Sequence, residues 1–96
     1  MTDVYELDGR QLSDKAEAHL YLQEMLAFPE YYGRNLDALF DVLTENSKDT
    51  LLWILHAEAV HPSITAVLED AMEENPFLTV IFEETDAEEA DDAAEN

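Results

Sequence analysis

The sequence predicts a small α/β domain in which helices pack on a three-stranded parallel sheet. Three short segments rich in aliphatic and aromatic residues, at 3–8, 51–55 and 77–82, have the length and composition of strands. The segments between them repeat apolar residues with the period of amphipathic helices. Strands that alternate with helices are joined by crossover connections, and such connections pair the strands in parallel.

The three predicted strands differ in pattern. Residues 3–8 alternate between apolar and acidic side chains, as in a strand with one covered face. Residues 51–55 form a continuous apolar run, which is typical of a strand covered on both faces. On this interpretation Trp53 belongs to the core. Residues 77–82 are predicted to be a strand from their β-branched and aromatic content.

Two of the predicted helices flank the middle of the chain. The first is expected at about 13–27, with Ser13 as its N-cap and Pro29 beyond its end. The last is expected at 62–74, because Pro62 suits the first turn of a helix. Apolar residues follow it at the helical spacing i, i+3, i+4 and i+7: Ile64, Val67, Leu68 and Ala71.

A central helix is expected at about 35–45, after a loop that carries Tyr31 and Tyr32. Asp37 and Asp41 are four residues apart, so they lie one turn above each other. Like charges at this spacing repel, and the helix dipole favours only the one in the first turn. The tyrosines add rigid, amphipathic contact area. The apolar stripe of this helix is Leu36, Leu39, Phe40 and Leu43.

The charge of the chain restricts its partners. Among 96 residues, 24 are acidic and 4 are basic, which gives a formal net charge of −20. This charge excludes a nucleic-acid binder, which needs a basic patch to replace phosphate counterions, and it argues against an anionic membrane surface. It favours a basic partner, because electrostatic steering accelerates association with one.

The acidic residues are not spread evenly. Eight of the 24 acids lie in residues 83–96, which otherwise contain little but alanine. We expect one folded domain over 1–83 and a disordered acidic tail over 84–96, because the tail cannot bury apolar surface. Residues 1–82 still carry 16 acids against 4 bases, so the folded part is acidic by itself.

The sequence lacks the residues that several classes of functional site require. The chain has no cysteine, which excludes a disulfide framework and a thiolate zinc site. It shows no signal-peptide pattern and no apolar run near the ~20 residues of a membrane span, so we expect a cytoplasmic protein. His19, His56 and His61 lack metal-binding spacing, and His61 suits the N-cap region of the last helix. We expect no metal, no cofactor and no catalytic residues.

The pair Asp37 and Asp41 allows three interpretations. The simplest is a solvated helix face. A second is a general acid and base, which is disfavoured because an exposed helix offers no cleft to keep one acid protonated. The third is a surface that binds a basic partner. A second acidic cluster, Glu69, Asp70, Glu73 and Glu74, gains meaning only if its helix lies beside the central one.

A family resemblance is densest over residues 28–44. The run Pro-Glu-Tyr-Tyr-Gly-Arg-Asn-Leu-Asp-Ala-Leu-Phe-Asp-Val-Leu-Thr resembles the signature of the barstar family, and a looser similarity extends over residues 2–83. The resemblance implies a three-stranded parallel sheet flanked by helices. It also implies an intracellular inhibitor that is a monomer when free and forms a 1:1 heterodimer with a basic, secreted, barnase-like microbial ribonuclease.

The resemblance also implies which residues bind the partner. Tyr31 would pack near the enzyme's catalytic histidine, and Asp37 would pair with basic residues at the rim of its cleft. Asp41 would enter the pocket that normally holds the substrate phosphate. An alternative is an immunity or binding protein of the same fold for another basic toxin. The full set of partner-binding candidates is Tyr31, Asn35, Asp37, Phe40, Asp41, Thr44, Asp70 and Glu74.

Overall fold

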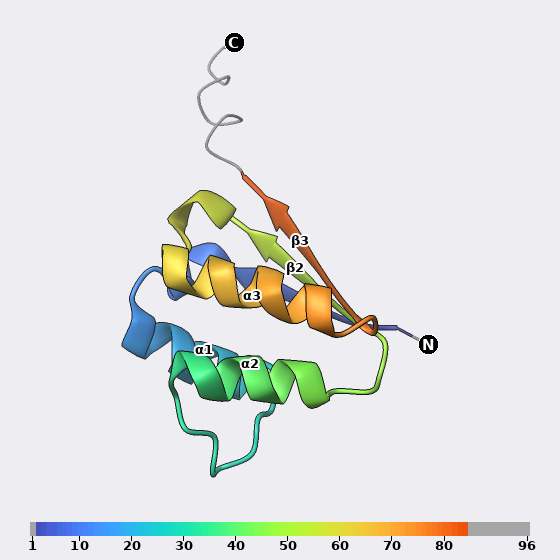
Figure 1. Ribbon diagram of the computed structural model, residues 1–96. Helices are drawn as coiled ribbons and strands as arrows, with labels where there is room; N and C mark the ends of the chain where they lie inside the picture. Colours follow the sequence, from blue (N-terminus) through green and yellow to red (C-terminus); the bar gives the residue numbers. More distant parts are fainter. Residues whose placement is uncertain (1, 85–96) are drawn as a thin grey trace.

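Three parallel strands form a single sheet in the computed structural model, which describes residues 2–84 (Figure 1). The strands are β1 (Asp3–Asp8), β2 (Thr50–Leu55) and β3 (Leu78–Glu83), in the spatial order β1-β2-β3. The predicted α/β class and parallel pairing are therefore confirmed. The expected acidic tail lies outside the described residues, apart from residue 84.

All three α-helices lie on the same side of this sheet (Figure 1). They are α1 (Lys15–Met25), α2 (Leu36–Glu45) and α3 (Pro62–Glu74). The strand order explains the arrangement, because both crossovers step across the sheet in the same direction. Two right-handed crossovers that step the same way must leave their helices on the same face.

The expectation that residues 51–55 are covered on both faces is therefore wrong. Leu52 and Ile54 are fully buried beneath the helices, whereas Trp53 between them is 37% exposed. Trp53 points to the uncovered face, because successive side chains in a strand alternate. It does not belong to the core, although its apolar neighbours along the chain suggested that it would.

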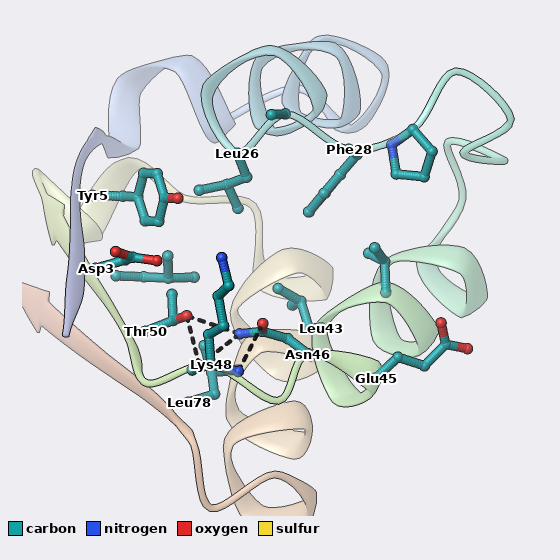
Figure 2. Close-up of a pocket in the computed structure, with 14 residues that line it drawn as sticks. Asp3, Tyr5, Leu26, Phe28, Leu43, Glu45, Asn46, Lys48, Thr50 and Leu78 are labelled. Atoms are coloured by element: carbon teal, nitrogen blue, oxygen red, sulfur yellow. Dashed lines mark hydrogen bonds between the residues drawn. The ribbon is translucent and has the colours of Figure 1, made fainter. Parts of the chain in front are cut away.

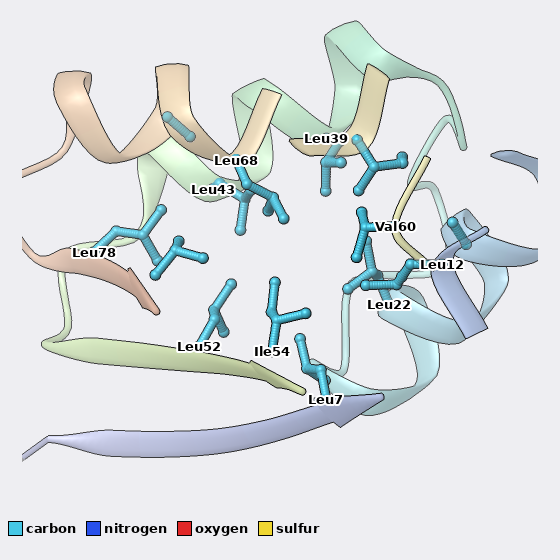
Figure 3. Packing of buried hydrophobic residues seen from close by; sticks show 14 of the residues in the cluster. Leu7, Leu12, Leu22, Leu39, Leu43, Leu52, Ile54, Val60, Leu68 and Leu78 are labelled. Atoms are coloured by element: carbon cyan, nitrogen blue, oxygen red, sulfur yellow. The ribbon is translucent and has the colours of Figure 1, made fainter. Parts of the chain in front are cut away.

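The core lies between the inner face of the sheet and the helices (Figure 3). Each strand contributes alternate residues, and each helix contributes residues from one face. Burying an aliphatic side chain of this size contributes roughly 1.5–3 kcal/mol, so this layer is the main source of stability. The largest fully buried side chains are Leu7, Leu12, Leu22, Leu39, Leu52, Ile54, Ile64 and Leu68.

The start of α1 differs from the prediction. The N-cap is Asp14, whose carboxylate accepts a hydrogen bond from the backbone N–H of Glu17 at 3.0 Å. Ser13 instead closes a short 3₁₀ helix, η1 (Gly9–Leu12), and its hydroxyl donates to the carbonyl of Arg10. The sequence pattern did not reveal this extra turn. The ends of α2 and α3 agree with the predictions, with Asn35 and His61 as N-caps.

Gly9 is required where η1 approaches the end of β2. A Cβ atom built on Gly9 would lie 2.7 Å from the carbonyl oxygen of Leu55 and would also overlap that of His56. Both obstacles are backbone atoms, so neither can move aside cheaply. His56 itself has a left-handed backbone, with φ of 56°, just before the second 3₁₀ helix, η2 (Ala57–Ala59). Glycine, which has no Cβ atom, thus allows η1 to pack closely against the end of β2 and the start of η2.

A buried amide, that of Asn75, joins α2 to α3 and β3. Its Nδ2 donates to the carbonyls of Leu43 and Asn46, both at 2.8 Å, at the end of α2. Its Oδ1 accepts from the backbone N–H of Phe77 at 2.9 Å, at the start of β3. The residue is 3% exposed. All the hydrogen-bonding groups of this side chain are therefore used within the protein.

Replacing Asn75 should lower stability substantially. Asn75→Ala removes three hydrogen bonds worth ~0.5–1.5 kcal/mol each and leaves buried backbone groups unpaired, so we expect a loss of about 2–4 kcal/mol in the free energy of unfolding. Urea unfolding measures this loss. Ser47→Ala is the control, since it removes an exposed polar side chain from the neighbouring loop and keeps the carbonyls that Asn75 uses. Equal losses in the two variants would contradict the role assigned to Asn75.

Candidate protein-binding surface

The loop between α1 and α2 is held in place by Gln23 of α1. The Nε2 of Gln23 donates to the carbonyl of Pro29 at 3.0 Å, and its Oε1 accepts from the Nε of Arg34 at the same distance. One side chain thus connects both ends of the loop to the helix. Arg34 has a left-handed backbone with φ of 56°, and its bond to Gln23 stabilises that turn.

Tyr32 anchors the middle of the loop in the core. Its hydroxyl lies 2.7 Å from Nδ1 of the buried His19, and its ring lies 4.9 Å from that of Phe28. Burial raises the pKa of Tyr32 to about 12, so the phenol keeps its proton. Burial, with a smaller effect of the Lys15 charge, lowers the pKa of His19. A neutral imidazole protonated on Nε2 accepts the phenol hydrogen at Nδ1.

Tyr31, next to this anchor, points out of the protein. Its side chain is 88% exposed, the highest value among the large apolar side chains of the described residues. It lines a shallow hollow between the loop and α2, together with Asp41 and Glu45. The structure therefore brings two predicted partner-binding residues, Tyr31 and Asp41, to the same hollow and adds Glu45 to them.

The exposed face of α2 carries a row of three carboxylates. Asp37, Asp41 and Glu45 are spaced i, i+4, i+8 and are all exposed, so they lie along one line on the helix. Within residues 2–84, none of the three takes part in an ion pair. Like charges along the row repel one another, and a cationic partner would reduce that repulsion.

The two ends of the row have different surroundings. Asp37 lines a second hollow together with Lys15 and Arg34, whose positive charges lower the negative potential there. Asn35 caps the helix: its Oδ1 accepts from the backbone N–H of Ala38 at 2.8 Å. Asn35 thus has a structural role at the position where a partner contact was also expected, and both roles are compatible because the residue is exposed.

The second acidic cluster does lie beside α2, because α3 packs against it (Figure 1). Met72 faces β3, since its sulfur accepts from the backbone N–H of Val80 at 3.2 Å. At 3.6 residues per turn, Asp70 and Glu74 lie on the opposite side of α3 from Met72, away from β3. Both are exposed. The helices that carry the two acidic clusters are therefore neighbours.

Phe40 and Thr44 are half-buried on the flank of α2 away from the loop. The hydroxyl of Thr44 lies 2.8 Å from the carbonyl of Phe40 and 3.2 Å from that of Asp41, so its hydrogen is used within the helix. These two residues can offer a partner apolar surface and hydroxyl lone pairs. Their contribution to binding stays a prediction.

Three residues that shape this surface were not among the partner-binding candidates. Glu45 could have been found by extending the i, i+4 spacing of Asp37 and Asp41 by one more turn. His19 and Gln23 act from α1, and no local pattern connects them to the loop. Their contacts with Tyr32, Pro29 and Arg34 exist only because α1 packs beneath the loop.

A separate cavity of about 320 Å³ lies between the loop, the end of α2 and the sheet (Figure 2). Asp3, Glu45 and Lys48 supply its charged groups, and most of its other lining residues are apolar. No serine, cysteine or histidine lines it. The cavity thus lacks the pairing of serine or cysteine with histidine that one class of hydrolases uses.

Two kinds of feature are absent from residues 2–84. No group of three or more histidine, cysteine or acidic side chains could hold a metal ion. None of the helices there has the length and apolar character to cross a membrane.

Comparisons with known proteins agree with the resemblance. The family model described as Barstar (barnase inhibitor) matches residues 2–95. A protein of Bacillus subtilis (strain 168), named "Putative ribonuclease inhibitor YrdF", is 53% identical over 38 residues. That match covers 40% of this chain and 42% of the relative, so the chain aligns with less than half of the relative's length. The family match covers nearly the whole chain.

The two neighbouring tyrosines should differ sharply in their effect on stability. Tyr31→Ala should change the free energy of unfolding by less than about 0.5 kcal/mol, because the side chain is exposed. Tyr32→Ala should cost about 3–5 kcal/mol, because it leaves a cavity in the core. Urea unfolding of both variants tests this pair. Similar losses would mean that the loop is not anchored as described.

Stability should also fall at mildly acidic pH through His19. Because its folded-state pKa lies below the ordinary value of 6.5, the unfolded chain takes up the proton first as pH falls. The stability contributed by neutral His19 is thus fully present above about pH 6.5 and is lost as pH falls through the lowered pKa. Comparing urea unfolding near pH 7.5 and near pH 5.5 should show a smaller pH effect in His19→Gln than in the original protein. The same pH effect in both would refute the assignment.

Proposed function

Because the chain belongs to the barstar family, we propose that it inhibits a basic, barnase-like microbial ribonuclease by covering its active site. The name of the Bacillus subtilis relative supports ribonuclease inhibition in general. The inhibitor is proposed to be a cytoplasmic monomer when free and to form a 1:1 heterodimer with a secreted enzyme. It performs no catalysis and needs no cofactor in this role.

The observation that carries the proposal is the exposed acidic row of α2 beside Tyr31. A ribonuclease active site binds a phosphodiester through cationic side chains. A carboxylate held on a rigid helix can take the place of that phosphate and accept charge-assisted hydrogen bonds. Asp41 is proposed for this position, because it is exposed, lies outside any ion pair within residues 2–84 and lines the same hollow as Tyr31.

The remaining candidates are proposed to surround Asp41. Tyr31 supplies a rigid aromatic contact on one side, and Asp37 pairs with basic residues at the rim of the cleft. Asp70 and Glu74 extend the acidic surface onto α3. Asn35, Phe40 and Thr44 complete the proposed contact surface.

The anchored loop supports tight binding. Binding is weakened whenever a loop must be ordered in the process. Here Gln23 and Tyr32 already hold the loop in the free protein, so Tyr31 is presented without that entropic cost.

Inhibition of barnase tests the proposal directly. Asp41→Asn should raise the inhibition constant about 10- to 150-fold, because a hydrogen bond to a charged group contributes roughly 1.5–3 kcal/mol. The assay follows cleavage of a fluorogenic RNA by barnase at fixed salt. Glu69→Gln is the matched control, since it removes one exposed charge of α3 that is not part of the proposed contact surface, and it should change the constant less than threefold.

Two outcomes would contradict the proposal. One is that barnase binds without losing activity, which would favour the alternative of a binding protein for another basic toxin. The other is that Asp41→Asn and Glu69→Gln raise the inhibition constant equally. In that case only the total negative charge would matter, and not the position of Asp41.

Lower salt should also raise the rate at which the original protein associates with barnase, because salt screens the attraction between the acidic inhibitor and the basic enzyme.

A further inference from the structure

The outer face of the sheet has no role in the proposed function. The helices all cover the inner face, so no helix within residues 2–84 covers the outer one (Figure 1). Parallel sheets are almost always covered on both faces, because their strands are apolar on both sides. An open parallel face with apolar side chains is thus a candidate docking surface.

An apolar stripe runs along the middle of this face. Alternation places Leu51, Trp53 and Leu55 of β2 on it, and the strand register places Val4 and Ile81 beside them. Val4 is 58% exposed and Ile81 is 44% exposed, so the stripe is open to solvent. These five residues form the apolar stripe.

Trp53, at the centre of the stripe, is held in one orientation. Its Nε1 donates to the carboxylate of Glu83 at 2.8 Å, across to β3. The hydrogen bond satisfies the polar end of the indole and leaves part of its apolar ring exposed. Tryptophan in this situation offers a large contact area at little cost in conformational entropy.

Acidic side chains lie on both edge strands. Glu6 of β1 is next to Trp53 in the register, and Glu83 lies on β3. Asp8 also belongs to this face, but Arg10 binds it with Nε 3.0 Å from Oδ1. The hydrogen bonds from Arg10 are the main cause that lowers the pKa of Asp8, and that pair adds no net charge. The stripe is thus bordered by negative charge on both sides.

We propose that this face binds an amphipathic, basic segment of a partner protein, with the segment's apolar row on the stripe and its cationic side chains against Glu6 and Glu83. The charges decide between this occupant and a second copy of the chain. Face-to-face association of two copies would bring two acidic borders together in a protein of net charge −20. A cationic amphipathic segment would cover the apolar stripe with its apolar row and place its positive charges beside the acidic borders.

The proposal does not rest on ribonuclease inhibition. The stripe and the acidic row of α2 lie on opposite sides of the molecule, since the sheet separates the stripe from the helix layer (Figures 1 and 3). Both partners can therefore be bound at once, and a variant on one side should leave binding on the other side unchanged.

Trp53 supplies the measurement, because it is the chain's one tryptophan. The probe is a synthetic leucine–lysine peptide of about 18 residues that forms an amphipathic helix. Its binding should shift the Trp53 emission to shorter wavelength. A peptide of the same composition in scrambled order, without an apolar face, should bind at least about tenfold more weakly. Asp41→Asn should leave the peptide affinity unchanged.

Ile81→Glu separates docking on the stripe from nonspecific attraction. The variant adds a negative charge, so nonspecific attraction predicts tighter binding of the basic peptide, whereas docking predicts binding about tenfold weaker or worse. Leu20→Glu is the matched control, because Leu20 is 50% exposed on α1, on the helix side. Ile81→Thr is the substitute if Ile81→Glu does not fold, because it keeps a β-branched residue in the strand. It should also weaken peptide binding, but by less than Ile81→Glu.

Three results would overturn the inference. The first is no emission shift with the amphipathic peptide. The second is that binding of the peptide by Ile81→Glu is as tight as by the original protein, or tighter. The third is a concentration-dependent dimer in sedimentation that Ile81→Glu abolishes, which would assign the face to a second copy of the chain.

Discussion

The side-chain amide of Asn75 is the interaction on which the proposed binding surface depends most. Two donors and one acceptor of a single buried side chain join the end of α2 to the start of β3, directly after α3. The amide can do this only because backbone groups from two distant parts of the chain, the end of α2 and the start of β3, converge on it. It sets where α2 lies beside α3, and hence where Asp41 lies relative to Asp70 and Glu74.

The loop before α2 illustrates how one chain segment can serve stability and binding together. Tyr31 and Tyr32 are adjacent and chemically identical, yet one is exposed and the other is buried against His19. The buried ring anchors the loop, and the exposed ring is thereby held for a partner. A rigid recognition loop needs one residue that anchors it and another that contacts the partner, because ordering a flexible loop on binding would weaken the affinity.

The strand order has consequences for both faces of the protein. With the order β1-β2-β3, the crossovers leave all helices on one side and all the acidic residues of α2 and α3 in that layer. The same order leaves Trp53 and Ile81 on the open side. The strand order thus produces two separate surfaces, one acidic and the other an apolar stripe with acidic borders.

The sequence by itself determined the main elements of this protein, because composition and periodicity are local: the three strands and the approximate span of α2 followed from them, and the i, i+4 spacing placed Asp37 and Asp41 on adjacent turns. Only the tertiary structure decided the rest. Strand order placed Trp53 outside the core, and packing of α1 beneath the loop separated Tyr32 from Tyr31 and engaged Gln23. These outcomes depend on contacts between residues distant in the chain, and no local pattern encodes which element will lie beside which.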